Sequence, residues 1–509
     1  MPLEMTGTLR MGIDRLLDRI RENLFPAAGS ALGVTFAFVF LRAIFTPIRI
    51  KVVTSILAPE TYGAVTLLSM TAHGAALIVS MGGFEMLLQR LPSAGKEERQ
   101  ILFGRVLLLS SLCGMIVVGV LGVLWGRVPV FREMAGFVSP WTAGLLVLLF
   151  LHIHQRMYWF LGCRQNWLAR LTQLFWSDLW FVPLLLLFPL LVLTAERVVL
   201  VWSFWLVLVC AVTWWRVPIV SSLAAVSRSP GRFSLWFVGL PLLPVILGEW
   251  IFRLSGHYVL LAHVGAVEMA FYALSLNVSL VGLIAATPLV DICIVELGHL
   301  AVGRERTRED HPTAIESRVV SHGLRHLWAV LMPAALVMII LPADIIGFLA
   351  AKSFLPAARY VPFAAVLPFL LALHLLLARL LMLFQDRRFV MFGALGSAFG
   401  AVVLCLLLVP RWGVNGALVA IMAACALVVL AFALRLKFWR WMRSGELGVK
   451  SIFLATVLLA VAIWGISMVE GGSVIRLLLA GGAAAIVILW FGLLRPSDFR
   501  VGAESQPLP

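Results

Sequence analysis

Long apolar segments alternate with short polar joints along the whole chain, and about fourteen such segments can be followed. Each is continuously apolar over about 18 or more residues, the length that a helix needs to cross a bilayer. Continuous rather than alternating hydrophobicity predicts helices and not barrel strands. The predicted spans lie at 30–57, 62–89, 102–125, 141–161, 174–194, 198–220, 235–262, 267–290, 324–349, 361–384, 389–409, 413–434, 451–469 and 475–494.

Composition supports a membrane protein. Of the 509 residues, 62% are hydrophobic and 13% are charged, and a soluble chain could not bury so much apolar surface. Basic residues gather in alternate joints, which predicts that both termini are cytoplasmic. The formal charge of +15 follows from this distribution and is no sign of nucleic-acid binding.

The joints divide the chain into expected domains. Residues 1–29 place apolar and charged side chains on different helical faces, as a cytoplasmic interfacial helix does. A segment rich in Ser, Pro and Gly at 221–234 predicts a linker between two lobes of six helices. The joints at 58–65 and 265–272 resemble each other, which indicates a parallel repeat. The expected parts are an interfacial segment at 1–29, an N-lobe at 30–220, a linker at 221–234, a C-lobe at 235–434, two further helices at 451–494 and a cytoplasmic tail at 495–509.

The first span carries three basic residues, Arg42, Arg49 and Lys51. Each costs about 2.5–3.5 kcal/mol near the bilayer centre, so lipid-facing positions are disfavoured. Arg42 and Arg49 lie about two helical turns apart on one face, and Pro47 between them predicts a kink. Arginine binds oxyanions bidentately, so we expect Arg42 and Arg49 to line a cavity for an anion. Alternatively, Arg49 and Lys51 extend toward the outer interface.

The seventh span carries Glu249, Arg253 and His257 at successive i, i+4 positions. This spacing places them on one face and predicts an intrahelical Glu249–Arg253 pair. Arg253 is a third candidate substrate-binding cation, while Glu249 and His257 are candidates for ion coupling or for a structural role. Glu85 is a further candidate counter-ion.

Other polar residues in the predicted spans give weaker indications of a functional site. We expect Asp178, Asp291, Glu296 and Asp344 to lie near span ends, where interfacial water solvates them. His374 and Arg379 are expected in the C-lobe. His152 and His154 point to different helix faces and predict no metal site. The six cysteines form no CxxC pair, so neither a disulfide framework, a metal site nor a cofactor is expected.

Several motifs resemble the polysaccharide and O-antigen lipid-linked oligosaccharide flippases of the multidrug, oligosaccharidyl-lipid and polysaccharide exporter superfamily. The similar residues are Leu57–Gly63, Gly82, Gly83 and Arg90, Gly162–Arg164 with Arg170, Gly256–Tyr258 with Phe271 and Tyr272, and Pro410–Ala417. The joint before the sixth span departs from the pattern, since it lacks the glycines found before the twelfth.

The resemblance implies two six-helix lobes around a central cavity, two additional C-terminal helices and alternating access. It implies a non-enzymatic flippase that moves a polyprenyl-diphosphate-linked oligosaccharide across the cytoplasmic membrane for surface polysaccharide synthesis. Its partners would be the lipid-linked glycan, membrane lipids and a glycan-assembly complex. A cation-coupled drug exporter and a membrane-embedded glycan polymerase, ligase or acyltransferase remain alternatives.

Overall fold

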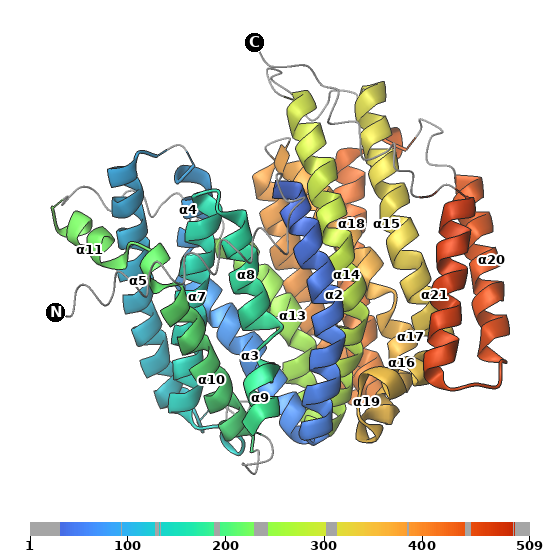
Figure 1. Ribbon diagram of the computed structural model, residues 1–509, viewed down its shortest axis with the longest axis horizontal. Coiled ribbons are helices and arrows are strands. Elements are labelled where there is room, and N and C mark those ends of the chain that lie inside the picture. Colours follow the sequence, from blue (N-terminus) through green and yellow to red (C-terminus); the bar gives the residue numbers. More distant parts are fainter. Residues whose placement is uncertain are drawn as a thin grey trace. The chain divides into compact units, whose positions relative to one another are not determined.

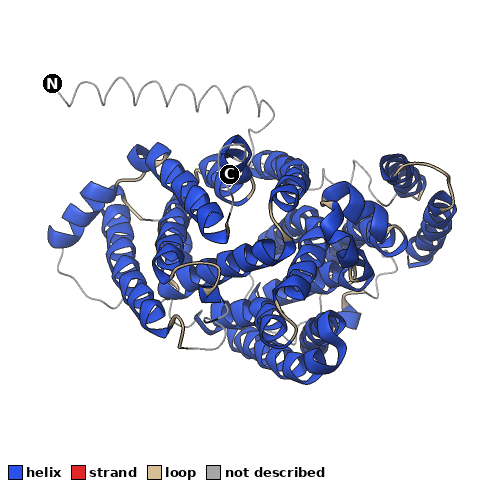
Figure 2. Cartoon of the chain, turned by 90° about the horizontal axis from the view of Figure 1, so that it is seen from below, coloured by secondary structure: helices blue, strands red, loops and turns tan. Residues whose placement is uncertain are grey.

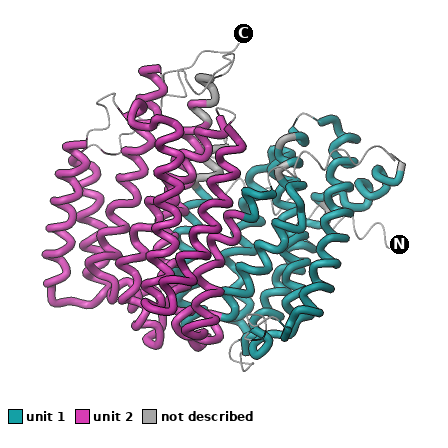
Figure 3. The backbone as a smooth tube through the Cα atoms, turned by 180° about the vertical axis from the view of Figure 1, so that it is seen from behind, with its two compact units in different colours: residues 1–56, 64–247 teal, residues 57–63, 248–509 magenta. Residues whose placement is uncertain are grey.

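The computed structural model describes residues 31–493 except 93, 128–131, 133, 188–193, 229–242, 302–312, 384–385, 443–448 and 492. Every element in these ranges is helical (Figure 1 and Figure 2). The chain forms two compact units, the first of residues 1–56 and 64–247 and the second of residues 57–63 and 248–509 (Figure 3). The predicted interfacial segment 1–29 and the tail 495–509 lie outside the described residues.

The N-terminal part of the chain supplies the first unit. Its helices are α2 (Ala31–Ile56), α3 (Pro59–Val79), α4 (Gly83–Arg90), α5 (Lys96–Leu124), α7 (Pro140–Gly162), α8 (Asn166–Ser177), α9 (Phe181–Leu187), α10 (Ala195–Val212), the 3-10 turn η2 (Trp214–Arg216) and α11 (Ile219–Arg228). The first residues of α3 belong to the second unit.

The second unit continues from α13. Its elements are α13 (Leu243–His263), α14 (Ala266–Ala301), α15 (Ala314–Ile340), α16 (Pro342–Leu349), the 3-10 helix η5 (Lys352–Arg359), α17 (Val361–Ala364), α18 (Leu367–Leu383), α19 (Arg387–Leu436), η6 (Phe438–Arg440), α20 (Val449–Ser467) and α21 (Ser473–Trp490).

Eleven of the described helices are long and apolar enough to cross a membrane, against about fourteen predicted spans. Three features of the described helices account for the difference. Helix α2 carries three basic residues, and α19 joins two predicted spans across Gly413, whose backbone is not helical (φ 54°). The predicted span 174–194 is divided between α8 and α9. Helices therefore stand at every predicted position, and the expectation of an all-α polytopic membrane protein is confirmed.

The predicted linker at 221–234 is helical at its start, contrary to expectation. Residues 221–228 belong to α11, which packs on α5. A Cβ on Gly104 of α5 would lie 2.4 Å from the carbonyl oxygen of Ser222, so the glycine permits this approach. Close packing on α5 thus overrides the breaker signal of the serines. The lobe boundaries drawn from the sequence stay predictions.

Two glycines allow helices of the second unit to pack closely on α14. The Tyr62–Gly63 motif packs on α14, because the Asn277 amide donates to the Tyr62 hydroxyl at 3.0 Å. A Cβ on Gly63 would lie 2.8 Å from Met269 Cε. Gly256 of α13 faces Tyr272 of α14, whose hydroxyl would lie 2.3 Å from an added Cβ. Two of the sequence motifs are therefore close-packing positions.

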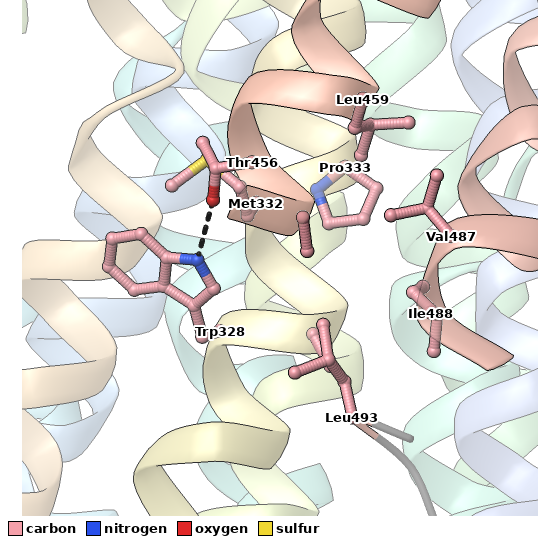
Figure 4. A pocket seen from close by; sticks show the side chains of 10 residues that line it. Trp328, Met332, Pro333, Thr456, Leu459, Val487, Ile488 and Leu493 are labelled. Atoms are coloured by element: carbon pink, nitrogen blue, oxygen red, sulfur yellow. Dashed lines mark hydrogen bonds between the residues drawn. The ribbon is translucent and has the colours of Figure 1, made fainter. Parts of the chain in front are cut away.

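Helices α20 and α21 attach to α15 and α16. The buried Asp344 carboxylate accepts hydrogen bonds from Ser473 at 2.7 Å and from Arg476 at 2.6 Å. The prediction that interfacial water solvates Asp344 is therefore wrong, because α21 supplies its partners. A small, mainly apolar pocket lies between α15, α20 and α21, where the Trp328 indole donates to Thr456 at 3.2 Å (Figure 4).

Glu268 of α14 binds Arg359, the last residue of η5, and Tyr360, which precedes α17. Its carboxylate accepts from the Arg359 guanidinium at 2.8 Å and from the Tyr360 hydroxyl at 2.7 Å. Burial and then the bond to Glu268 raise the pKa of Tyr360 from 10.0 to about 12.

Replacing Gly256 by alanine should lower the free energy of unfolding by about 1–3 kcal/mol, because the new methyl group meets the Tyr272 ring. Thermal unfolding of the purified chain in detergent measures the change. Gly481→Ala in α21 is the control, since an added Cβ there meets no atom within 4 Å. Equal stability of the two variants would contradict tight α13–α14 packing.

Tyr360→Phe should lower the free energy of unfolding by about 1 kcal/mol at neutral pH through loss of the bond to Glu268. In the folded chain Tyr360 keeps its proton up to a pKa of about 12, while the unfolded chain releases it near 10. The stabilisation is therefore complete below pH 10 and is lost as pH rises toward 12. Unfolding measured from about pH 9 to about pH 12 should show a shallower decline for the Phe variant. A parallel decline in the two proteins would exclude this titration.

Candidate functional site

The predicted fifth span is broken, and the break places the C-terminus of α8 inside the span. Helix α8 ends at Ser177, Asp178 occupies its C-cap and α9 begins at Phe181. Pro183 lies in the first turn of α9, where a missing N–H is tolerated. Because a helix C-terminus carries partial negative charge and unpaired carbonyls, the break creates a site that attracts cations.

Helix α2 supplies the cations to this break. The Arg42 Nε donates to Asp178 Oδ2 at 2.8 Å, and Thr46 Oγ1 donates to Asp178 Oδ1 at 2.9 Å. Arg49 donates to the Ser177 carbonyl, and its Nη1 lies 3.6 Å from Asp178 Oδ1. Ser177 Oγ also donates to Asp178 at 2.5 Å. The structure thus brings Arg42 and Arg49 together on one carboxylate.

Asp178 was missed as a functional residue, and its predicted solvation near a span end is wrong. Its side chain is 0% exposed, because the break in α8 turns it toward α2 and not toward water. One signal pointed to it: two arginines on one face of a span need a counter-charge. The sequence could not say which of several acidic residues supplies that charge.

The two arginines are only partly covered. The Arg42 and Arg49 side chains are 25% and 22% exposed. Arg42 uses Nε for Asp178, and no other hydrogen bond joins its side chain to the part of the chain that the structure describes. Its two Nη groups therefore remain available to an anion.

A third arginine stands near this pair. Arg170 of α8 donates to Gln173 at 3.1 Å, and its Nε is buried without a hydrogen-bond partner among the described residues. It lies close enough to Arg42 for the two positive charges to interact. We call Arg42, Thr46, Arg49, Arg170 and Asp178 the arginine site.

The predicted residues of α13 separate into two environments. Glu249 and Arg253 are exposed, while His257 is buried edge-on against Tyr272 at 4.8 Å between ring centroids. No ion pair joins the Glu249 and Arg253 side chains in the described structure, so the predicted intrahelical pair is wrong. Glu249 instead lies near enough to His374 and Arg379 of α18 for charge interactions with both.

Arg379 of α18 forms an ion pair with Asp291 of α14. The expectation that interfacial water alone solvates Asp291 is therefore wrong. Both side chains are about one third exposed, at 34% and 35%. Together with Glu249, Arg253 and His374 they form a polar cluster with balanced charge in the second unit.

Two candidates are not placed. The side chains of Glu85 in α4 and Glu296 in α14 lie outside the described residues. Among the residues that are described, no group of three or more His, Cys, Asp or Glu has the arrangement of a metal site. Arg42 and Arg49 belong to the first unit and Arg253 to the second, so their joint binding of one substrate stays a prediction.

Comparison with known proteins identifies the class of fold. No protein-family model matches the chain. No curated protein matches it by sequence. Solved structures do match: the lipid II flippase MurJ in an inward closed conformation has a TM-score of 0.65 at 12% identity, covering 91% of this chain and 99% of that one.

Two multidrug transporters are also similar. An inward-facing MATE family transporter of the MOP superfamily has a TM-score of 0.61 at 15% identity, with 82% and 99% of the two chains covered. The MATE multidrug transporter DinF-BH has a TM-score of 0.56 at 14% identity, with 82% and 97% covered. The chain therefore has the fold that these solved transporter structures share. Identity this low shows the fold alone.

Proposed function

We propose that this protein is a flippase that moves a polyprenyl-diphosphate-linked oligosaccharide across the cytoplasmic membrane, with both termini cytoplasmic. The observation that carries the proposal is the arginine site. Arg42 and Arg49 are held on a buried carboxylate, and both guanidinium groups keep an accessible part.

The charge of the arginine site fits a diphosphate. Arg42 and Arg49 supply two positive charges and Asp178 removes one, while Arg170 adds another nearby. Three guanidinium groups around one carboxylate suit an anionic ligand such as a diphosphate. Guanidinium groups suit this ligand because their planar forks bind phosphate oxygens in pairs and stay charged in a partly dry site.

The position of the arginines within a span also favours an anionic lipid headgroup. A free solute reaches such a site only through water, whereas a lipid-linked headgroup moves with its tail still in the bilayer. We expect Arg253 to contact the same headgroup, with Glu249 exchanging a proton or ion during transport. His257 suits packing better than coupling, because its Nδ1 bonds to the Arg253 carbonyl at 3.2 Å and its ring lies on Tyr272.

The comparisons support transport more broadly than they support this cargo. One similar structure is a lipid II flippase and others are multidrug transporters. All three are transporters and not enzymes, which agrees with a non-enzymatic role. We propose lipid-linked glycan and membrane lipids as the partners, together with proteins of a glycan-assembly complex.

A cation-coupled exporter of small molecules is the second candidate. The observation in its favour is the exposed carboxylate of Glu249, which makes no hydrogen bond or ion pair within the described residues. Such a protein would bind an organic cation at this carboxylate and would not need the arginine site. Glu249→Gln should then abolish transport of a cationic dye, while Arg42→Ala should leave it intact.

Arg42→Ala should reduce translocation of a fluorescent polyprenyl-diphosphate-linked sugar in proteoliposomes at least about tenfold, because one of the phosphate-binding guanidinium groups is lost. Protection of the sugar label from a quencher outside the vesicles measures the translocation. Arg42→Lys should recover part of the activity, since a point charge replaces the planar fork.

Arg435→Ala is the matched control, because Arg435 forms an ion pair of the same kind with Asp386, 2.9 Å apart, outside the arginine site. It should translocate at the wild-type rate. Full activity of correctly inserted Arg42→Ala protein would show that transport does not require the arginine site.

A further inference from the structure

Asp178 holds a place that a ligand phosphate would otherwise take. Its carboxylate contacts Arg42 Nε at 2.8 Å and lies 3.6 Å from Arg49 Nη1, the same two groups that we assign to the diphosphate. It is fully buried and also accepts from Thr46 and Ser177. The arginine site therefore contains a carboxylate of its own beside both guanidinium groups.

An incoming phosphate does not displace this carboxylate. Asp178 has no exposed surface, and stripping the arginines from it would leave a buried charge with only hydroxyl donors, which is strongly unfavourable. The Nη groups of Arg42 are accessible, so a ligand can bind them while Nε stays on Asp178. The ligand and Asp178 then share the same guanidinium groups and repel each other.

We infer that Asp178 is the counter-charge that limits affinity for the diphosphate and so permits its release. This inference rests on the proposed function, because it concerns the release step of the same site. A transporter that binds its cargo too tightly cannot let it go on the other side, and each turnover then stops at release. Two arginines in a dry site without a counter-charge would create that problem for a doubly charged headgroup.

The repulsion has a measurable signature, because it scales with the charge of the ligand. Removing one negative charge from the site strengthens binding of a dianion about twice as much, in free energy, as binding of a monoanion. A purely structural role for Asp178 predicts the opposite sign, since loss of the anchor would disorder the arginines and weaken both ligands.

The experiment compares full-length Asp178→Asn with wild type in proteoliposomes. The probes are a fluorescent polyprenyl-diphosphate-linked disaccharide, which carries two negative charges, and the matching polyprenyl-monophosphate-linked disaccharide, whose phosphodiester carries one. The variant should bind the diphosphate probe at least about tenfold more tightly and the monophosphate probe about threefold more tightly. Its maximal translocation rate for the diphosphate probe should fall together with KM, and the gain in affinity should shrink at high salt.

A second pair of variants tests the same idea with the opposite sign and does not depend on the folding of Asp178→Asn. Thr46 lies within hydrogen-bond distance of Asp178, so Thr46→Asp adds a negative charge and Thr46→Asn serves as its neutral control. Thr46→Asp should bind the diphosphate probe more weakly than Thr46→Asn does, by a larger factor than for the monophosphate probe. Asp386→Asn, which removes a paired carboxylate elsewhere, should behave as wild type.

The outcomes separate the two proposals. If wild-type protein does not translocate the diphosphate probe, the proposed function fails and the inference fails with it. If wild type translocates the probe but Asp178→Asn binds it no more tightly, or the gain does not grow with ligand charge, the inference alone is overturned.

Discussion

The structure of the first unit depends on one fully buried carboxylate between two arginines of the opening helix. Each arginine would be unfavourable in hydrocarbon without a partner, since an isolated basic residue costs about 2.5–3.5 kcal/mol at the centre of a span. Asp178 and the carbonyl of Ser177 satisfy Arg42 and Arg49, and the break after α8 is what puts both acceptors in reach. The break, the ion pairs and the position of α2 on α8 are therefore one feature.

The same interaction leaves parts of the arginine side chains accessible to a ligand. A carboxylate that neutralised both guanidinium groups completely would leave only a structural pair. Here two arginines face one carboxylate, and each guanidinium keeps an accessible part.

Close contact between helices is the second constraint. Lipid tails are as apolar as leucine, so helices in a bilayer associate through packing and polar contacts and not through the hydrophobic effect. Gly63 and Gly256 let neighbouring helices approach α14 to a distance at which a methyl group would collide. Motifs that resemble a family of flippases thus describe packing positions of a fold. That fold also serves drug transporters, so the cargo has to be argued from charges and not from architecture.

The sequence by itself determined the helical class and the approximate place of the described helices, because a bilayer demands long, continuously apolar segments with internally bonded backbone. It did not show the break between α8 and α9. The sequence also indicated that Arg42 and Arg49 need polar partners, since an unpaired charge inside such a segment is costly. Only the tertiary structure decided their partner, because Asp178 is distant in the chain and is aimed by a helix break. For the same reason Glu249 and Arg253 were predicted as a pair along one helix, whereas α18 brings competing charges to them. Periodicity reports what lies on a helix face, and only packing decides what lies opposite that face.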